Sequence, residues 1–216
     1  MEPNAPNSYP VSFSVDYPDR PLNRLTTAFR IFMVIPILIV LGAISGTTWQ
    51  QADDRDPGTG LTIVLTGTGV LFLPPLLMIL FRQKYPRWWF DWNLELQRFG
   101  ARVMAYLALM DDRYPSTDQQ QAVHLDYPYP DAARDLNRWL PLVKWFLAIP
   151  HYVVLVILDI AAFFVVIVAW FAILFTGGYP RGLFDFVEGV IRWQTRVGAY
   201  AFTLVTDAYP PFRLGP

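Results

Sequence analysis

Long apolar runs alternate with short polar segments along this chain, and the runs have the length of membrane-spanning helices. Crossing a hydrocarbon core of ~30 Å takes roughly 20 helical residues. The first two runs cover about 25–44 and 61–81. Pro74 and Pro75 lie inside the second run and predict a kink, because each proline removes a backbone donor and clashes with the preceding turn. The pattern predicts two spans joined by a polar hairpin loop.

A third apolar run, at 139–175, is too long for one span and has the length of two. His151 and Asp159 are among its few polar interruptions. We expect a tight hairpin at Asp159, which divides the run into spans at about 139–158 and 160–175. The alternative is one long kinked helix or a re-entrant segment, because a turn at this place would lack the glycine or asparagine that turns favour.

One segment of the chain occurs twice. Residues 85–106 and 179–200 share ten of 22 aligned residues, and they begin YPRWWFD and YPRGLFD. The upstream sequences LNR and IP also recur. Self-similarity of this kind indicates a tandem duplication, with a first repeat at 1–115 and a second at 116–216. Because each repeat would contain two spans, both repeats would enter the membrane from the same side.

Each repeated segment is predicted to form an amphipathic helix after a span. The residue before a proline is displaced from the α region, whereas proline itself is tolerated in the first turn of a helix. Tyr-Pro therefore ends one helix and begins the next. Apolar and charged residues at helical spacing predict helices over about 86–110 and 180–206, lying along the cytoplasmic interface.

Two short strands are also predicted, near the start of each repeat. Apolar and polar residues alternate at 11–16 and again at 123–126, which is the period of a strand. The two strands could pair with each other and shield their edges. The predicted fold class is all-α integral membrane, with four transmembrane helices as two tandem two-helix repeats, each followed by a cytoplasmic interfacial amphipathic helix.

Composition and charge support a membrane location. Hydrophobic residues make up 54% of the chain and charged residues 16%, against about 25% charged in typical soluble domains. The net charge of −1 gives no indication of nucleic-acid binding, and the absence of cysteine excludes disulfides and thiolate chemistry. Lysine and arginine flank the runs on one side, so the positive-inside rule predicts that both termini are cytoplasmic.

Charged and aromatic residues of the two amphipathic helices are candidates for contact with lipid phosphates or with a protein partner, because guanidinium groups match phosphate geometry. The alternative is that the arginines only form salt bridges within their own helices. The candidates are Arg87, Trp88, Trp89, Trp92, Arg98, Arg102, Arg181, Arg192 and Arg196.

His151 and Asp159 are the candidate intramembrane polar site. Ionisable residues within spans are often functional, although Asp159 at a hairpin tip would be solvated and His151 would then serve as a hydrogen-bonding residue between helices. No nucleophile elbow, phosphate-binding loop or metal-ligand spacing occurs in the sequence. We therefore predict no catalytic residues, no metal and no cofactor.

The segment YPRGLFDFVEGVIRWQTRVGAYAFTLVTDAYPPF, together with RPLNRLTTAFRIFMVIP and AIPHYVVLVIL, resembles the bacterial membrane family catalogued as domain of unknown function 4389. The resemblance extends over nearly the whole chain as two copies. It departs from the family pattern at Trp88 and Trp89 in the first copy. It implies a multi-pass protein of the bacterial cytoplasmic membrane and supplies no catalytic residues.

These observations predict a non-catalytic membrane accessory or scaffold subunit that docks on a larger membrane protein complex or organises the surrounding lipid. The alternative is a small transporter of lipid or apolar cargo, or a lipid-binding membrane protein. The expected partners are membrane lipids and a larger membrane protein complex, without nucleic acid.

Overall fold

The computed structural model describes residues 9–45, 67–117 and 119–216. The predicted loop between the first two apolar runs, and the first residues of the second run, lie outside this part of the chain. The elements in chain order are β1 (Ser12–Val15), α1 (Arg24–Ser45), α2 (Gly67–Arg82), α3 (Arg87–Leu107), β2 (Val123–Asp126), the short 3-10 turn η1 (Leu140–Leu142), α4 (Lys144–Leu147), α5 (Ile149–Thr176), α6 (Arg181–Gly198) and the π-helical turn η2 (Ala199–Thr203).

The two predicted strands form, and their predicted pairing is confirmed. β1 and β2 run antiparallel, and Phe13 lies opposite Leu125. Phe13 and Leu125 are buried, whereas the intervening Ser14 and His124 are exposed, as the period of a strand requires. The apolar face of this ribbon joins the main core, which includes Phe90 of α3 and residues of α6.

Two helices begin where the Tyr-Pro motifs predict. Pro86 precedes α3 and Pro180 precedes α6, and both have an extended backbone. The angles are φ −63° and ψ 128° at Pro86, and φ −61° and ψ 127° at Pro180. The carbonyl of each proline accepts the first helical hydrogen bond, from Phe90 and from Phe184, each at 3.0 Å. The fixed φ of proline explains why these helices start at these positions.

The tyrosines before these prolines are buried and fix the helix starts in the fold. Tyr85 donates its hydroxyl to the carbonyl of Thr203 at 2.7 Å, and Tyr17 donates to the carbonyl of Tyr179 at 2.5 Å. Burial raises the pKa of both Tyr85 and Tyr179 well above the usual value for tyrosine. Tyr85 is therefore protonated and remains a donor across the physiological range.

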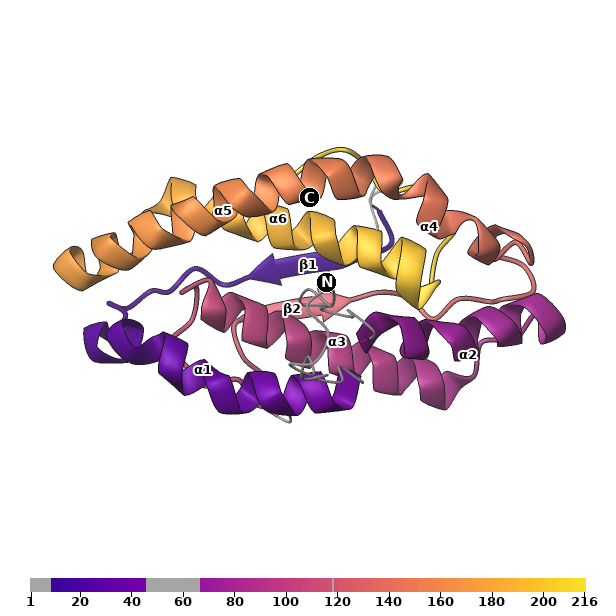
Figure 1. Ribbon diagram of the computed structural model, residues 1–216, viewed down its shortest axis with the longest axis horizontal. Helices are drawn as coiled ribbons and strands as arrows, with labels where there is room; N and C mark the ends of the chain where they lie inside the picture. The colour runs from indigo at the N-terminus through magenta and orange to yellow at the C-terminus, as the bar shows by residue number, and fades with distance from the viewer. Residues whose placement is uncertain (1–8, 46–66, 118) are drawn as a thin grey trace, which may run out of the picture.

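The order of packing is α5, α6, β1, β2, α3 and α1, because each of these elements contacts the next. Figure 1 shows the result, with α5 along one long side of the molecule, α1 and α2 along the opposite side, and the ribbon between them. α5 also contacts α1 directly. The two outer sides of the molecule therefore approach each other at one place.

The predicted architecture of four transmembrane helices in two two-helix repeats is wrong. α5 continues through Asp159 for 28 residues without a hairpin, so the division into spans at 139–158 and 160–175 is also wrong. From Ile149 onward the run is one helix, as in the single-helix alternative, whereas the residues before it form separate short elements. No glycine or proline interrupts the chain near Asp159, and a helix propagates once formed unless something stops it. α5 ends instead at Gly177, whose φ of 79° is left-handed.

The other predicted spans differ in outcome. α1 (Arg24–Ser45) covers the first predicted run at 25–44 as a helix. Of the described residues, only Ile149–Thr176 forms a helix long and apolar enough to cross a membrane. The described part of the second predicted run is helical as α2 (Gly67–Arg82), with Pro74 and Pro75 inside it. The run before α5 is broken into η1 and α4. The boundary between repeats at residues 115 and 116 stays a prediction.

Candidate functional site

The outer surface of α5 is strongly apolar and exposed. Of its most apolar 18-residue stretch, only 11% is buried. Soluble monomers rarely expose contiguous apolar patches larger than a few hundred Å². Large exposed residues follow the whole helix, and they include Val153, Val156, Ile157, Ile160, Phe163, Phe164, Ile167, Val168, Phe171 and Phe175. This helix is suited to contact with lipid.

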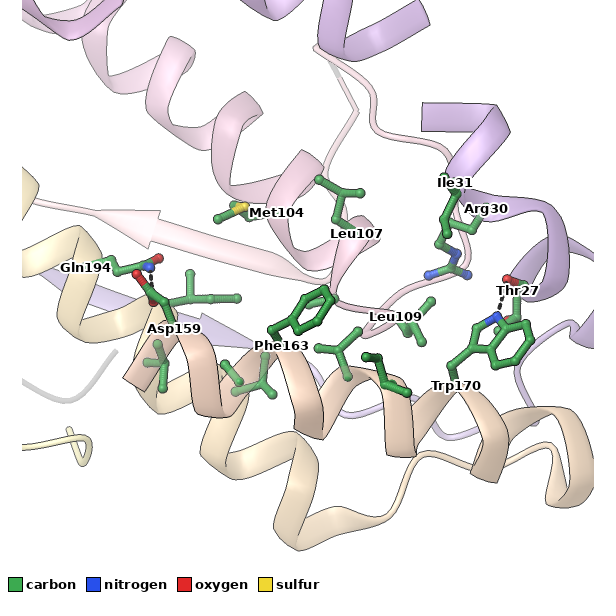
Figure 2. Close-up of a pocket in the computed structure, with 17 residues that line it drawn as sticks. Thr27, Arg30, Ile31, Met104, Leu107, Leu109, Asp159, Phe163, Trp170 and Gln194 are labelled. Atoms are coloured by element: carbon green, nitrogen blue, oxygen red, sulfur yellow. Dashed lines mark hydrogen bonds between the residues drawn. The ribbon is translucent and has the colours of Figure 1, made fainter. Parts of the chain in front are cut away.

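A groove of about 680 Å³ lies where α5 approaches α1, with α3 and α6 completing its walls. This volume is within the roughly 300–1,000 Å³ of small-ligand sites. Figure 2 shows Met104, Leu107 and Phe163 between its two ends. The other apolar residues of the walls are Ile31, Ala108, Leu109, Ala162, Val166, Ile167, Val187, Val190 and Ile191. A chemically matching occupant is an apolar chain.

One end of the groove contains the predicted residue Asp159. The amide of Gln194 on α6 donates to the Asp159 carboxylate at 2.6 Å (Figure 2). Asp159 therefore lies in the middle of α5, against α6, and not at a hairpin tip. The hydrogen bond between the two helices fixes this end of the groove.

The other end contains Arg30, which is 2% exposed. Its Nη1 donates to the carbonyls of Tyr106 and Asp111, each at 2.8 Å, and its guanidinium carbon lies 4.4 Å from the centroid of the Tyr106 ring. Its Nε and Nη2 are buried and have no hydrogen-bond partner among the described residues. A buried donor without a partner costs free energy. This edge of the guanidinium could recover that free energy by donating hydrogen bonds to an anionic ligand.

Thr27 lies one turn before Arg30 and completes this end. The indole of Trp170 on α5 donates to the Thr27 carbonyl at 3.1 Å, which is the contact that joins α5 to α1 (Figure 2). The Thr27 hydroxyl is buried and has no hydrogen-bond partner within the part of the chain that the structure describes. Two residues that line this end of the apolar groove, Thr27 and Arg30, therefore have unused hydrogen-bonding capacity within the described part of the chain.

His151, the second predicted polar residue of α5, does not line the groove. It is fully buried, its Nδ1 accepts a hydrogen bond from the indole of Trp193 at 3.0 Å, and its ring stacks on Phe212 with centroids 4.0 Å apart. Asp159 is eight residues further along the same helix, about 12 Å at ~1.5 Å per residue. The structure therefore does not bring the two predicted polar residues together.

Four of the predicted arginines contact backbone carbonyls. Arg98 donates to the carbonyl of Leu125 on β2 at 2.9 Å, and Arg192 donates to the carbonyl of Phe13 on β1 at 2.9 Å. Arg102 reaches the carbonyl of Ser116 at 2.6 Å. Arg196 reaches that of Gly215 at 2.9 Å. These contacts hold the ribbon and the chain end against α3 and α6.

The remaining predicted contact residues lie nearer the surface. Arg87 lies over the ring of Tyr129 at 4.9 Å and Arg181 over that of Tyr17 at 4.6 Å. The tryptophans form a cluster in which Trp89 lies between the other two, with centroids 5.4 Å from each. Trp88 and Trp92 are 69% and 42% exposed. Their role in lipid or partner contact stays a prediction.

Arg30, Thr27, Trp170 and Gln194 were not predicted as site residues. The available signal was Arg30 itself, a charged residue in the first turns of an apolar run, since such residues within a membrane helix are often functional. Within the described ranges, no group of three or more histidine, cysteine, aspartate or glutamate side chains could hold a metal ion.

Within residues 9–45, 67–117 and 119–216, the site thus lies beside one helix that is long and apolar enough to cross a membrane. Residues 139–213 match the family described as Domain of unknown function (DUF4389), which supports the resemblance for the segment from η1 to beyond η2. The match covers one copy and not the two that we predicted. Searches of curated proteins and of solved structures each found no match.

Proposed function

We propose that this protein is a lipid-binding protein of the bacterial cytoplasmic membrane, in which the groove between α1, α3, α5 and α6 holds a lipid chain. The observation that carries this proposal is the groove itself: its walls are apolar, its volume is about 680 Å³, and one wall is the exposed apolar helix α5. A chain can enter such a groove from the membrane without crossing water.

The polar residues of the groove favour binding and orientation of a lipid. They lie only at the two ends, with Asp159 and Gln194 at one and Thr27 and Arg30 at the other. A few polar groups among apolar walls fix the direction of a ligand. Trp88 and Trp92, which are exposed on α3, would place that helix at headgroup level, where tryptophan is favoured.

The test is lipid retention by the protein extracted gently from its own membrane, measured by native mass spectrometry. Val166 lines the groove and Val168 is exposed on α5 outside it, so Val166→Trp and Val168→Trp add the same side chain to the same helix. We expect Val166→Trp to lose the retained lipid and Val168→Trp to keep it. Equal retention by both variants, or a wild-type protein without lipid, would contradict the proposal.

A second candidate, an accessory subunit of a larger membrane complex, is favoured by the exposed indoles of Trp88 and Trp92, because tryptophan is enriched at interface hot spots. The same spectra test it. A stoichiometric protein partner that is lost in Trp88→Ala and Trp92→Ala would support this role, whereas a chain that carries lipid and no protein partner would count against it.

A further inference from the structure

Three cations are buried among the described residues, Arg30, Lys144 and Arg196. Two of them, Arg30 and Lys144, each lie against a tyrosine ring and donate to a backbone carbonyl. Arg30 lies over the Tyr106 ring at 4.4 Å and donates to the Tyr106 carbonyl. Lys144, which is fully buried, lies 5.1 Å from the centroid of the Tyr200 ring and donates to the Thr206 carbonyl at 2.6 Å. Both cations therefore contact a tyrosine ring and a backbone carbonyl. The two sites differ in whether the cation has a carboxylate as its counter-ion.

Lys144 has its own carboxylate. Its Nζ lies 2.7 Å from Oδ1 of Asp207. Burial lowers the pKa of Lys144, while the hydrogen bond and charge of Asp207 raise it. The charge of Lys144 is therefore balanced by a carboxylate of the protein itself, and the site needs no ligand to balance it.

Arg30 has no such partner among the described residues. Asp111 and Asp112 act electrostatically on Arg30, but both form ion pairs with other arginines. Asp112 pairs with Arg20 at 2.5 Å and Asp111 with Arg113 at 2.9 Å. The carbonyls of Tyr106 and Asp111 use only Nη1. The Nε and Nη2 edge is unpaired, and it belongs to a residue that lines the groove.

We propose that the groove binds a long-chain carboxylate, with its headgroup held by Nε and Nη2 of Arg30 and by the Thr27 hydroxyl, and its acyl chain lying along α5 toward Phe163. This assignment rests on the proposed lipid-binding function and specifies its ligand class.

The headgroup chemistry follows from the donors. The Nε and Nη2 edge is a planar fork that matches the two oxygens of one carboxylate. A single negative charge neutralises the single charge of Arg30. A phosphate monoester would bring about −1.5 to −2 charges, which is more than the single charge of Arg30 neutralises.

The shape and the apolar walls of the groove indicate a ligand with a long acyl chain. From Trp170 back to Asp159 the groove extends along eleven residues of α5, about 16 Å at ~1.5 Å per residue. Figure 2 shows Leu107, Leu109 and Phe163 beside this path. The path is elongated and apolar, which suits one extended acyl chain more than a compact ligand.

The test measures binding of four probes to the full chain, purified from membranes in detergent and stripped of lipid. The probes are hexadecanoate, its methyl ester, hexadecyl phosphate and a zwitterionic diacyl phospholipid. We expect hexadecanoate to bind about tenfold or more tightly than the methyl ester, because the ester lacks the charge that Arg30 pairs with. Tighter binding of hexadecyl phosphate would overturn the carboxylate assignment.

The variants are Arg30→Met, Thr27→Val and, as a matched control on the same helix, Arg24→Met, which changes an exposed arginine outside the groove. We expect Arg30→Met to lose at least about tenfold in affinity for hexadecanoate and little for the methyl ester. Thr27→Val should lose a smaller factor, and Arg24→Met none.

A spectroscopic measurement covers the case in which Arg30→Met fails to fold. With hexadecanoate labelled with ¹³C at the carboxyl carbon, a carboxylate paired with Arg30 should titrate at lower pH on the wild type than on Arg30→Lys, which keeps the charge and loses the fork. Identical titration on both, or equal binding of acid and ester, would overturn the headgroup assignment and leave the lipid-binding function standing. Failure of every probe to bind would instead contradict that function.

Discussion

The segment around α3 and the segment around α6 share their anchoring contacts and differ in what surrounds them. In both, an arginine of the helix reaches a carbonyl of the ribbon, Arg98 to Leu125 and Arg192 to Phe13. The cation beside η2, which follows α6, is Lys144, and it has Asp207 as its carboxylate. Arg30 beside α3 has no carboxylate in a described ion pair. The two regions have similar local sequences. Nevertheless, Lys144 has a carboxylate partner, whereas Arg30 keeps hydrogen-bond donors without a partner among the described residues.

The largest expected effect tests this difference at the two cations. Lys144→Met leaves Asp207 without its cation, and removing one partner of a buried pair costs about 3–5 kcal/mol. Arg30→Met leaves only two backbone carbonyls without their donor, which costs about 1–3 kcal/mol. The free energy of unfolding in detergent, measured by chemical denaturation, should fall further for Lys144→Met. Equal losses would show that both cations are structural in the same way.

The two anchoring arginines give the next effect. Arg192 bonds to the carbonyls of Phe13 and Leu214 and pairs with Glu188, with little of its side chain exposed. Hydrogen bonds to charged groups contribute about 1.5–3 kcal/mol each, so Arg192→Ala should destabilise the protein by at least that amount. Arg98 is more exposed, and Arg98→Ala should cost less in the same assay. The reverse order would break the assignment of the stronger anchor to α6.

A further difference is that Leu214 packs against Gly189 of α6. A Cβ built there would lie 2.8 Å from Cβ and 3.1 Å from the carbonyl oxygen of Leu214. Gly189→Ala should therefore cost about 1–3 kcal/mol through overpacking. Gly182→Ala, on the same helix with open space around it, should be neutral or stabilise by up to about 1 kcal/mol. Thermal melts of the two variants in one detergent provide the comparison.

The smallest effect concerns the middle of α5. Asp159→Asn keeps a carbonyl that can accept from Gln194, so we expect a change in stability of less than about 1 kcal/mol and no loss of bound hexadecanoate. The affinities of Asp159→Asn and Arg30→Met for hexadecanoate should be measured in the same experiment. A loss of affinity as large as that of Arg30→Met would place the headgroup at the Asp159 end of the groove.

Local features of the fold were predictable. The alternation at 11–16 and 123–126 predicted both strands, and Pro86 and Pro180 predicted the starts of α3 and α6. These predictions depend on the side-chain period and on the fixed φ of proline, which are properties of a few consecutive residues.

The candidate site was only partly predictable. Asp159 was predicted and lines the groove, but its position in a continuous helix was not, because a hairpin and a single helix have the same apolar composition. α5 is one helix in a fold where its first part packs beside α6 and its last part meets α1 at Trp170. The absence of glycine and proline near Asp159 favours the single helix locally, and these contacts between distant segments stabilise it in the fold.

By itself, then, the sequence determined the apolar character of α5, the ribbon and the two helix starts, since each follows from neighbouring residues. The tertiary structure alone decided which buried cation has a counter-ion. Asp207 lies within reach of Lys144, whereas Asp112 pairs with Arg20 and leaves Arg30 with unpaired donors. An ion pair depends on distances of a few ångströms between distant segments, and only the folded chain fixes those distances.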